Sequence, residues 1–241
     1  MTMLVMTGTG TGVGKTISTA AIAALAAAGG QRVAVLKPAQ TGLGPDEPGD
    51  LADVVRLAGP EVTTRELRRY PDPLSPEAAA RRSGLPTLDP GEIARAASDL
   101  DTDHDLTLIE GAGGLLVRFD AAGSSLADVA WSLGSLVIIV AEAGLGTLNA
   151  TALTAEVATK RGLTVAGVII GSWPAEPDLA ALSNLEDLPV AAGAPLLGVL
   201  PAGLGTASPE EFLEAARAGL SPWFGGEFDP ELFTGRASAQ K

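Results

Sequence analysis

The sequence contains no cysteine and a single histidine, His104. The chain therefore has no disulfide, no thiolate metal site and no cysteine nucleophile, and one histidine cannot build a multi-histidine zinc centre. Basic residues are also few, with 16 Lys and Arg against 29 Asp and Glu and a net charge of −13. Because an acidic surface repels phosphate backbones, we expect no nucleic-acid partner. We interpret His104, which lies in a polar stretch, as a solvated loop residue.

Long hydrophobic runs are absent too. No apolar run reaches the roughly 18 uninterrupted residues of a membrane span, so we expect no membrane segment. The N-terminus has no basic region and no cleavage motif, so we expect no signal peptide and a cytoplasmic location. The chain has 241 residues, 46% of them hydrophobic and 19% charged, as in one large folded domain. That domain is predicted to span residues 1–218, with 219–241 as a peripheral C-terminal tail.

Short apolar runs alternate with helical patterns along the chain. The runs are almost continuously hydrophobic, which is typical of strands buried on both faces. The predicted strands are Leu4–Thr7, Arg32–Lys37, Leu106–Glu110, Leu136–Ala141, Val165–Ile170 and Leu196–Leu200. The predicted helices are Lys15–Ala28, Leu51–Ala58, Pro76–Ser83, Gly91–Leu100, Leu126–Leu133, Leu148–Arg161 and Pro209–Ala218. This alternation predicts a single-domain α/β fold, with a mostly parallel sheet and helices on both faces. Pro189–Gly193 fits either a loop or a short strand.

The strongest signal is the segment Gly8–Thr16, which lies between the first predicted strand and the first predicted helix. Its glycines permit the backbone angles and the close approach that a phosphate needs, and the helix N-terminus adds partial positive charge. In such a P-loop Lys15 reaches the β- and γ-phosphates, and the Thr16 hydroxyl binds Mg²⁺. Five residues separate Gly8 from Gly14, where the strict pattern has four, so the loop is a variant. The sequence therefore predicts a site for a nucleoside triphosphate and Mg²⁺.

Other candidate site residues follow predicted strands, where ligands bind in open parallel sheets. Lys37 ends the second strand, where its charge can stabilise a transferring phosphate or carbamate. Glu110 ends the next, the usual place of a second Mg²⁺ ligand, and glycines follow it. Gly144–Asn149 opens a helix whose N-terminus suits a carboxylate. Each also has a plainer explanation: a surface lysine, a strand-end turn or a strand–helix turn. Helix capping alone explains Asp50.

Taken together, these segments resemble the dethiobiotin synthetase family of the biotin pathway. The resemblance covers roughly residues 1–205 and depends on the order and spacing of Thr7–Thr16, Lys37–Gly42, Gly49–Leu51, Glu110–Gly114 and Gly144–Asn149. It implies ATP- and Mg²⁺-dependent carboxylation of 7,8-diaminopelargonic acid with CO₂ and closure of the ureido ring. The implied intermediates are a carbamate and a carbamic–phosphoric anhydride, and ADP and phosphate are released. It also implies a homodimer, in which the helix start at Gly146–Asn149 of one subunit holds the carboxylate of the substrate bound by the other.

The resemblance implies roles for individual residues. Catalysis is expected from Lys37, Lys15 and Thr11, and Mg²⁺ ligation from Thr16, Asp50 and Glu110, with Asp46 and Asp53 as alternatives to Asp50. The nucleotide is expected to contact Gly12, Val13, Gly14, Lys15, Thr16, Ile17, Gly171, Ser172, Trp173, Pro201, Ala202 and Gly203. The substrate is expected to contact Thr41, Gly113, Gly146, Thr147, Leu148 and Asn149. Many family members have an asparagine where this chain reads Gly171-Ser-Trp-Pro174, so the choice between ATP and another triphosphate stays open.

Three other classes of protein share parts of this pattern. Partitioning-type ATPases carry an extra lysine near the start of the phosphate loop, and here no lysine precedes Gly14 in the loop. Glutamine-dependent amidases of related fold need a catalytic cysteine, which this chain lacks. A relative that only binds nucleotide would not need Lys37 together with Glu110. The sequence therefore favours the ligase.

Overall fold

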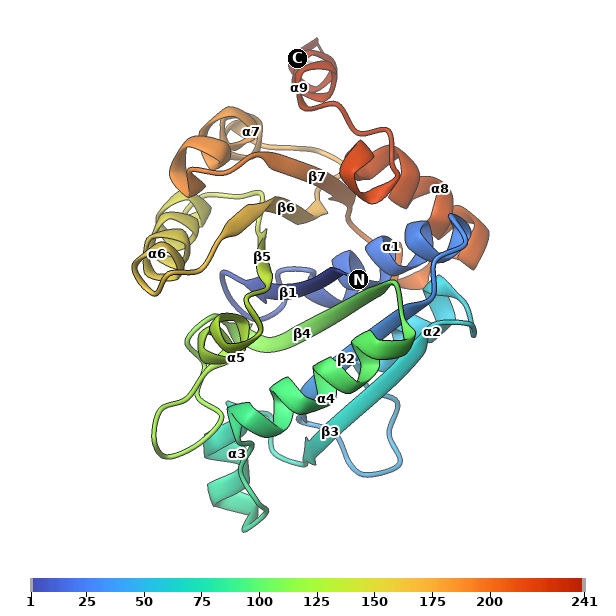
Figure 1. Cartoon of the computed structure of the whole chain (residues 1–241). Coiled ribbons are helices and arrows are strands. Elements are labelled where there is room, and N and C mark those ends of the chain that lie inside the picture. The colour runs from blue at the N-terminus through green and yellow to red at the C-terminus, as the bar shows by residue number, and fades with distance from the viewer. Residues whose placement is uncertain (1, 240–241) are drawn as a thin grey trace.

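The computed structural model describes residues 2–239 and is built around one sheet of seven strands in the order β3-β2-β4-β1-β5-β6-β7 (Figure 1). Every neighbouring pair of strands is parallel. The strands are β1 (Thr2–Gly8), β2 (Val33–Thr41), β3 (Thr63–Tyr70), β4 (Leu106–Gly114), β5 (Leu136–Ala141), β6 (Val165–Trp173) and β7 (Leu196–Pro201). The chain builds one half of the sheet before the other, and β1 lies between β4 and β5. Such an arrangement places a ligand crevice beyond the carboxyl ends of the central strands.

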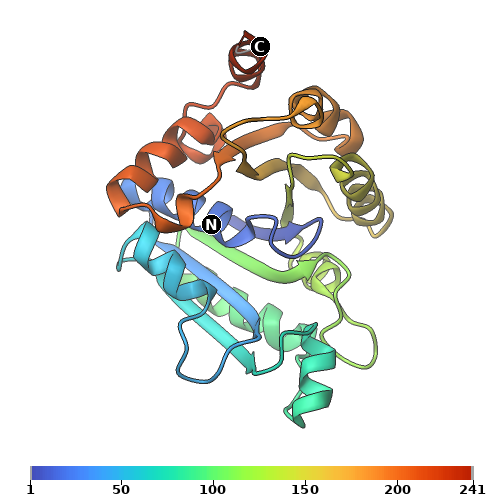
Figure 2. The same ribbon diagram turned by 180° about the vertical axis from the view of Figure 1, so that it is seen from behind.

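Helices cover both faces of the sheet (Figures 1 and 2). One face carries α1 (Lys15–Ala28), α2 (Asp50–Ala58) and α8 (Pro209–Gly219). The other carries α4 (Pro90–Asp103), α5 (Leu126–Leu133), α6 (Thr147–Lys160) and α7 (Leu179–Ala192). Three further elements lie at the margins: α3 (Pro76–Ser83) beside β2 and β3, the short helix η1 (Leu204–Thr206) after β7, and η2 (Pro222–Phe224) near α1. The last helix, α9 (Pro230–Ala239), packs on α7 and β7.

The core consists of two apolar layers, one on each side of the sheet. Successive residues of a strand point to opposite faces, so Leu4 and Met6 join the layer under α1 while Val5 joins the layer under α5. All three side chains are at most 2% exposed. Because both faces are covered, both sets of positions must be apolar, which is why the strands read as continuous hydrophobic runs.

The predicted α/β fold is confirmed, and every predicted strand and helix overlaps an observed one. Three of the longer elements were missed: β3, α7 and α9, the last of which lies in the segment predicted to be a peripheral tail. The edge strand β3 reads Thr-Thr-Arg-Glu-Leu-Arg-Arg-Tyr, and its charges hide it from a search for apolar runs. The helix α7 was also missed, and the prediction of a loop or short strand at Pro189–Gly193 was wrong. Pro189 lies inside α7, where Leu185 and Leu188 are buried against the sheet, and Gly193 ends the helix with a φ of 61°.

His104 and the C-terminal residues are more ordered than the sequence predicts. His104 ends α4, and its ring nitrogens lie 2.6 Å from the Leu100 carbonyl oxygen and 2.9 Å from the Thr63 hydroxyl of β3. After residue 219 the chain forms η2 and α9, and Phe228 between them is 3% exposed. The division of the chain at 218 and 219 stays a prediction. No helix in residues 2–239 has the length and hydropathy to cross a bilayer.

Asp105 and Arg32 join the starts of β4 and β2 and give the fold a measurable pH response. Asp105 accepts hydrogen bonds from the Arg32 side chain and backbone, both at 2.9 Å, and these bonds lower the pKa of Asp105 to about 2. A carboxyl with a lowered pKa stabilises the fold fully above its unfolded pKa of about 3.9 and loses that contribution as the pH falls towards 2. In urea unfolding we expect Asp105→Asn to be slightly less stable than wild type near neutral pH, with the difference shrinking below about pH 4. A difference independent of pH would contradict this.

Candidate active site

The loop between β1 and α1 has the shape of an anion-binding site. It turns at Gly12 and Gly14, whose φ angles of 79° and 92° lie in the region that glycine adopts without strain. Gly14 caps α1, and among residues 2–239 no side-chain cap occupies the start of the helix, so its first N–H groups can bind a ligand. Lys15 is 7% exposed, and its Nζ donates to the Gly10 carbonyl at 2.7 Å. Donors and one positive charge therefore converge within the loop.

The same loop is seated directly against the end of β6. A Cβ atom added to Gly14 would lie 2.4 Å from the Gly171 carbonyl oxygen, and one added to Gly171 would lie 2.3 Å from the Val13 carbonyl oxygen. The two glycines thus touch backbone to backbone. Val13 points its side chain into the core and is 2% exposed.

The remaining residues predicted to contact the nucleotide meet at the ends of β6 and β7. Trp173 pairs with Pro201 in the sheet, and the Ala202 N–H donates to the Trp173 carbonyl at 2.8 Å. Ser172 and residues 201–203 are exposed, whereas Trp173 is half-buried. The sheet therefore brings these two distant segments together beside the phosphate loop, and their contact with a nucleotide stays a prediction.

A charged cluster lies where β2 and β4 end. Lys37 Nζ lies 2.7 Å from Glu110 Oε1 and 2.5 Å from Asp50 Oδ2. The Thr16 hydroxyl donates to the same Oε1 of Glu110 at 2.9 Å. The Lys37 and Glu110 side chains are 4% and 1% exposed, while that of Asp50 is 35% exposed. Residues from β2, β4, α1 and α2 therefore meet at one point.

The electrostatics of this cluster keep Lys37 charged. Burial alone would lower the pKa of Lys37, but the charges of Glu110 and Asp50 and their hydrogen bonds outweigh burial and raise the pKa. Burial, and then the charge of Lys37, lower the pKa of Lys15. Two lysines thus line one cavity together with the carboxylates of Asp50, Asp53 and Glu110, so both cationic and anionic groups face a ligand there.

The donors around Glu110 fit Mg²⁺. Glu110 Oε2 is buried and has no hydrogen-bond partner among the described residues. A buried oxygen without a partner is costly until a cation or donor reaches it. The Thr16 hydroxyl bonds to the other oxygen of the same carboxylate, and the Asp50 carboxylate joins the cluster through Lys37. Mg²⁺ binds such oxygens together with waters and substrate phosphates.

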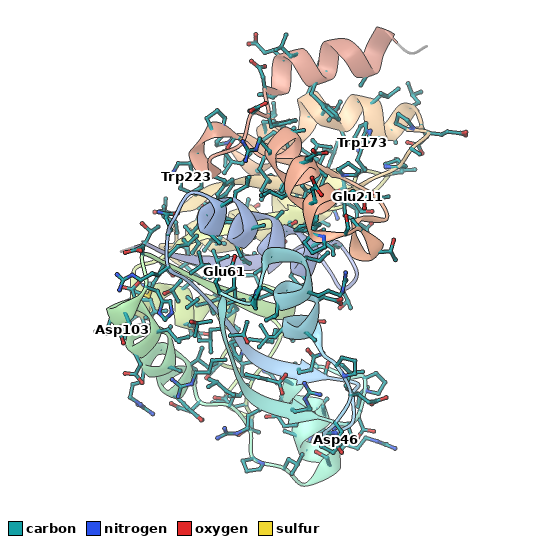
Figure 3. All side chains as sticks on the ribbon, turned by 90° about the vertical axis from the view of Figure 1, so that its right-hand side faces the viewer. Asp46, Glu61, Asp103, Trp173, Glu211 and Trp223 are labelled. Carbon is teal, nitrogen blue, oxygen red and sulfur yellow. The ribbon has the colours of Figure 1, made fainter. Side chains whose placement is uncertain are left out.

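Asp50 differs from the two alternative metal ligands, Asp46 and Asp53, in the contacts that fix its position. Its N–H donates to Gln40 Oε1 at 3.0 Å, which fixes the start of α2 beside Lys37. Asp53 is paired with Arg56 at 2.7 Å, and Asp46 is exposed on the loop before α2 (Figure 3). Asp50 is thus the acidic residue of this segment that reaches the cluster.

Three residues that position the site were missed from sequence. Gln40 lies inside the segment Lys37–Gly42 that carries the family resemblance, so the sequence does contain a signal for it. Arg69 of β3 donates to the Gly44 carbonyl at 3.0 Å and holds the loop before Asp50, but nothing distinguished it from the other charges of that strand. Asn184 of α7 donates to the carbonyls of Ala143 and Gly144 at 2.7 and 3.1 Å, and this shapes the loop before α6.

A cavity of about 640 Å³ joins the phosphate loop to the charged cluster. The predicted residues that line it are Thr11, Gly12, Gly14, Lys15, Thr16, Ile17, Lys37, Thr41, Asp50, Glu110 and Gly113, together with Asp53, one of the two alternatives to Asp50. Thr11 faces Gly113, since a Cβ atom on Gly113 would lie 3.6 Å from the Thr11 hydroxyl. Gly146–Asn149 do not line it. They open α6 elsewhere on the surface, where Asn149 is exposed and the Thr147 side chain is buried.

The chain is similar to proteins of known family over most of its length. A family model described as "AAA domain" matches residues 2–209. An ATP-dependent dethiobiotin synthetase of Streptomyces avermitilis is 59% identical over 233 residues, which cover 97% of this chain and 98% of that protein. One of Saccharopolyspora erythraea is 60% identical over 228 residues, covering 95% and 99%.

Among solved structures, the cell division ATPase MinD of Pyrococcus furiosus superposes with a TM-score of 0.54 at 19% identity, covering 99% of this chain and 98% of that one. FtsY of Mycoplasma mycoides superposes with a TM-score of 0.58 at 15% identity, covering 99% and 68%. At these identities the likeness shows the fold alone.

Proposed function

The chain belongs to the ATP-dependent dethiobiotin synthetases, within the AAA-domain family, and on that premise we propose how its residues perform the reaction. It is an ATP-dependent ligase of biotin biosynthesis that forms dethiobiotin. The observation that carries the mechanism is Lys37, buried and charged between Asp50 and Glu110 on the wall of the cavity that begins at the phosphate loop.

The proposed reaction has three steps. One amine of 7,8-diaminopelargonic acid attacks CO₂ and loses a proton, which gives a carbamate. A carbamate oxygen then attacks the γ-phosphorus of ATP, and ADP leaves. The second amine attacks the carbonyl carbon of this mixed anhydride, the bond to the phosphate oxygen breaks, and the amine loses its proton as the ureido ring closes. The anhydride makes the last step feasible because phosphate is a far better leaving group than oxide.

The chief obstacle is charge repulsion, since an anionic carbamate must approach an anionic triphosphate. We propose that Lys15 binds the β- and γ-phosphates, and that Lys37 contacts the phosphoryl group during transfer. Thr11 and Thr41 line the same cavity and would hydrogen-bond the carbamate or phosphate, while the backbone at Gly113 borders the diamine. Thr16, Asp50 and Glu110 would hold Mg²⁺, which supplies charge neutralisation and orientation of the phosphates when bound.

We also propose a homodimer with shared sites. Gly146–Asn149 do not line the cavity of their own chain, which is what a site completed by a partner subunit requires. Three large, exposed apolar side chains support an interface in this region. Trp131 on α5 is 69% exposed, Leu145 just before α6 is 92% exposed, and Leu153 on α6 is 56% exposed. A cytoplasmic location stays a prediction.

Asn149 provides a test of this shared site. Because the N-terminus of α6 is proposed to bind the carboxylate of the diamine, we expect Asn149→Ala to raise the KM for the diamine about tenfold, with the KM for ATP little changed. Steady-state kinetics with each substrate varied in turn would measure both. A rise in the KM for ATP alone would show that this site is misplaced.

The function itself is tested by phosphate release from Mg²⁺-ATP and bicarbonate, with and without 7,8-diaminopelargonic acid, and by mass spectrometry of the product. Diamine-dependent release with dethiobiotin formed is the expected result. Phosphate release that ignores the diamine, or no ureido product with any of the common triphosphates, would overturn the proposal. The panel of triphosphates also determines the base preference.

A further inference from the structure

The C-terminal helix reaches back to the nucleotide site through a chain of aromatic rings. The ring of Phe233 on α9 meets the ring of Trp173 edge to face, with centroids 5.6 Å apart and planes at 78°. On its other side Phe233 contacts Phe228, with centroids 5.5 Å apart. Phe228 is 3% exposed, so this chain of rings is anchored in the core. Edge-to-face pairs at such distances are favourable beyond the area that they bury.

Trp173 is the residue through which this contact can act on the nucleotide site. It ends β6 two residues after Gly171, which touches the phosphate loop. Its carbonyl accepts the N–H of Ala202, so its position also fixes the turn after β7. Both segments belong to the set proposed to contact the nucleoside, and in Figure 3 Trp173 lies below α9. A shift of Trp173 would therefore move the nucleoside end of the site without touching Lys15 or Thr16.

Other contacts of this turn come from the opposite side of the site. Arg56 of α2 donates to the Gly205 carbonyl at the far end of the turn. Ile17 of α1 lies beneath it, since a Cβ atom on Gly205 would meet the Ile17 side chain at 3.7 Å. On the side of β6, the backbone of Trp173 pairs with Pro201 at the start of the turn, and the Trp173 ring packs against Phe233. Packing of Phe233 on Trp173 thus adds a support on the side of β6 to those that Arg56 and Ile17 provide.

We propose that Phe233 is a positioning residue for the nucleoside end of the nucleotide site, so that α9 takes part in binding a nucleoside triphosphate. The inference rests on the proposed placement of the nucleotide between Gly171–Trp173 and Pro201–Gly203. The triphosphate end is held by the P-loop and does not depend on α9. The contribution of Phe233 is therefore specific to ligands that carry a nucleoside.

Two probes separate the two ends of the site: Mg²⁺-ATP, and Mg²⁺-tripolyphosphate, which has the phosphates but no nucleoside. With Phe233→Ala in the full chain we expect the Kd for ATP, measured by calorimetry, to rise about three- to tenfold, the range that an aromatic pair corresponds to. The Kd for tripolyphosphate is expected to stay the same. In turnover, the KM for ATP rises by the same factor, while kcat at saturating ATP is unchanged. Phe233→Leu, which keeps apolar bulk, is expected to lie between wild type and Phe233→Ala.

Leu232→Ala is the matched control, because Leu232 lies on the same helix and is 61% exposed. It is expected to leave both dissociation constants unchanged. Equal weakening of ATP and tripolyphosphate by Phe233→Ala would overturn the proposal, since it would indicate general damage to the fold. Unchanged ATP binding in Phe233→Ala would also overturn it.

The comparison of the Kd values for ATP and tripolyphosphate needs no turnover. The proposed function and the proposed role of Phe233 can therefore fail independently. If wild type binds ATP but makes no dethiobiotin, the proposed function falls and the ratio of the two dissociation constants still judges Phe233. If wild type makes dethiobiotin and that ratio is unaffected by Phe233→Ala, only the role of Phe233 falls.

Discussion

Lys37→Ala is expected to abolish measurable dethiobiotin formation, with a fall in kcat of at least about a hundred- to a thousandfold, while ATP binding persists. Lys37 is proposed to stabilise charge on the transferring phosphoryl group, and such preorganised contacts are worth most in the transition state. The phosphate loop, with Lys15 and the N-terminus of α1, remains to bind ATP. Phosphate release with the diamine measures turnover, and calorimetry with Mg²⁺-ATP measures binding.

The same variant should respond more strongly to Mg²⁺. Without Lys37, Asp50 and the buried Glu110 lose the cation that bridges them, and two like charges face each other. We therefore expect Mg²⁺ alone to raise the melting temperature of Lys37→Ala more than that of wild type. Lys160→Ala is the control, because Lys160 is exposed and forms its ion pair with Glu156 on α6, away from the cavity. Substantial turnover in Lys37→Ala would refute the catalytic role, and an equal response to Mg²⁺ would refute the proposed metal position.

The fold could be predicted where burial dictates composition. Strands of a covered parallel sheet must be apolar on both faces, so β1 and β5 are visible from sequence with nearly correct ends. The edge strand β3 has no such constraint, because its side chains Arg65, Arg68 and Arg69 form ion pairs at the margin of the sheet. Helix α7 contains a proline, which argues against a helix in the sequence. The helix is recognised only from the packing of its buried leucines. These two elements depend on tertiary contacts that local pattern does not encode.

The site could be predicted where function demands a residue type at a strand end. The phosphate loop, Lys37 and Glu110 do come together, because the sheet aligns the carboxyl ends of β1, β2 and β4. The residues that hold these groups in place were not predictable in this way. Asn184 and Arg69 act through carbonyl groups of loops whose path is known only in three dimensions. The choice of Asp50 likewise depends on the hydrogen bond from its N–H to Gln40.

Gly171→Ala is the second substitution with a large expected effect, although Gly171 carries no side chain and no charge. Its added methyl group would lie 2.3 Å from the Val13 carbonyl oxygen and 3.0 Å from the Gly14 Cα atom. Both are backbone atoms of the phosphate loop, so no side chain can rotate away, and the loop itself must move. Overpacking of this kind destabilises by about 1–3 kcal/mol. Displaced N–H groups lose hydrogen bonds to phosphate, so we expect ATP binding to weaken about a hundredfold or more.

Gly205→Ala separates this steric effect from the mere loss of a glycine near the nucleotide. A Cβ atom on Gly205 meets its nearest neighbour, the Ile17 side chain, at 3.7 Å, which is ordinary van der Waals contact. Calorimetry should therefore give near wild-type ATP binding for Gly205→Ala and strongly reduced binding for Gly171→Ala. Tripolyphosphate should weaken as much as ATP in Gly171→Ala, because the damaged part is the phosphate loop. If Gly171→Ala bound ATP normally, the loop would have to be seated differently from the backbone contact between Gly14 and Gly171, and the assignment of β6 to the wall of the nucleotide site would fail.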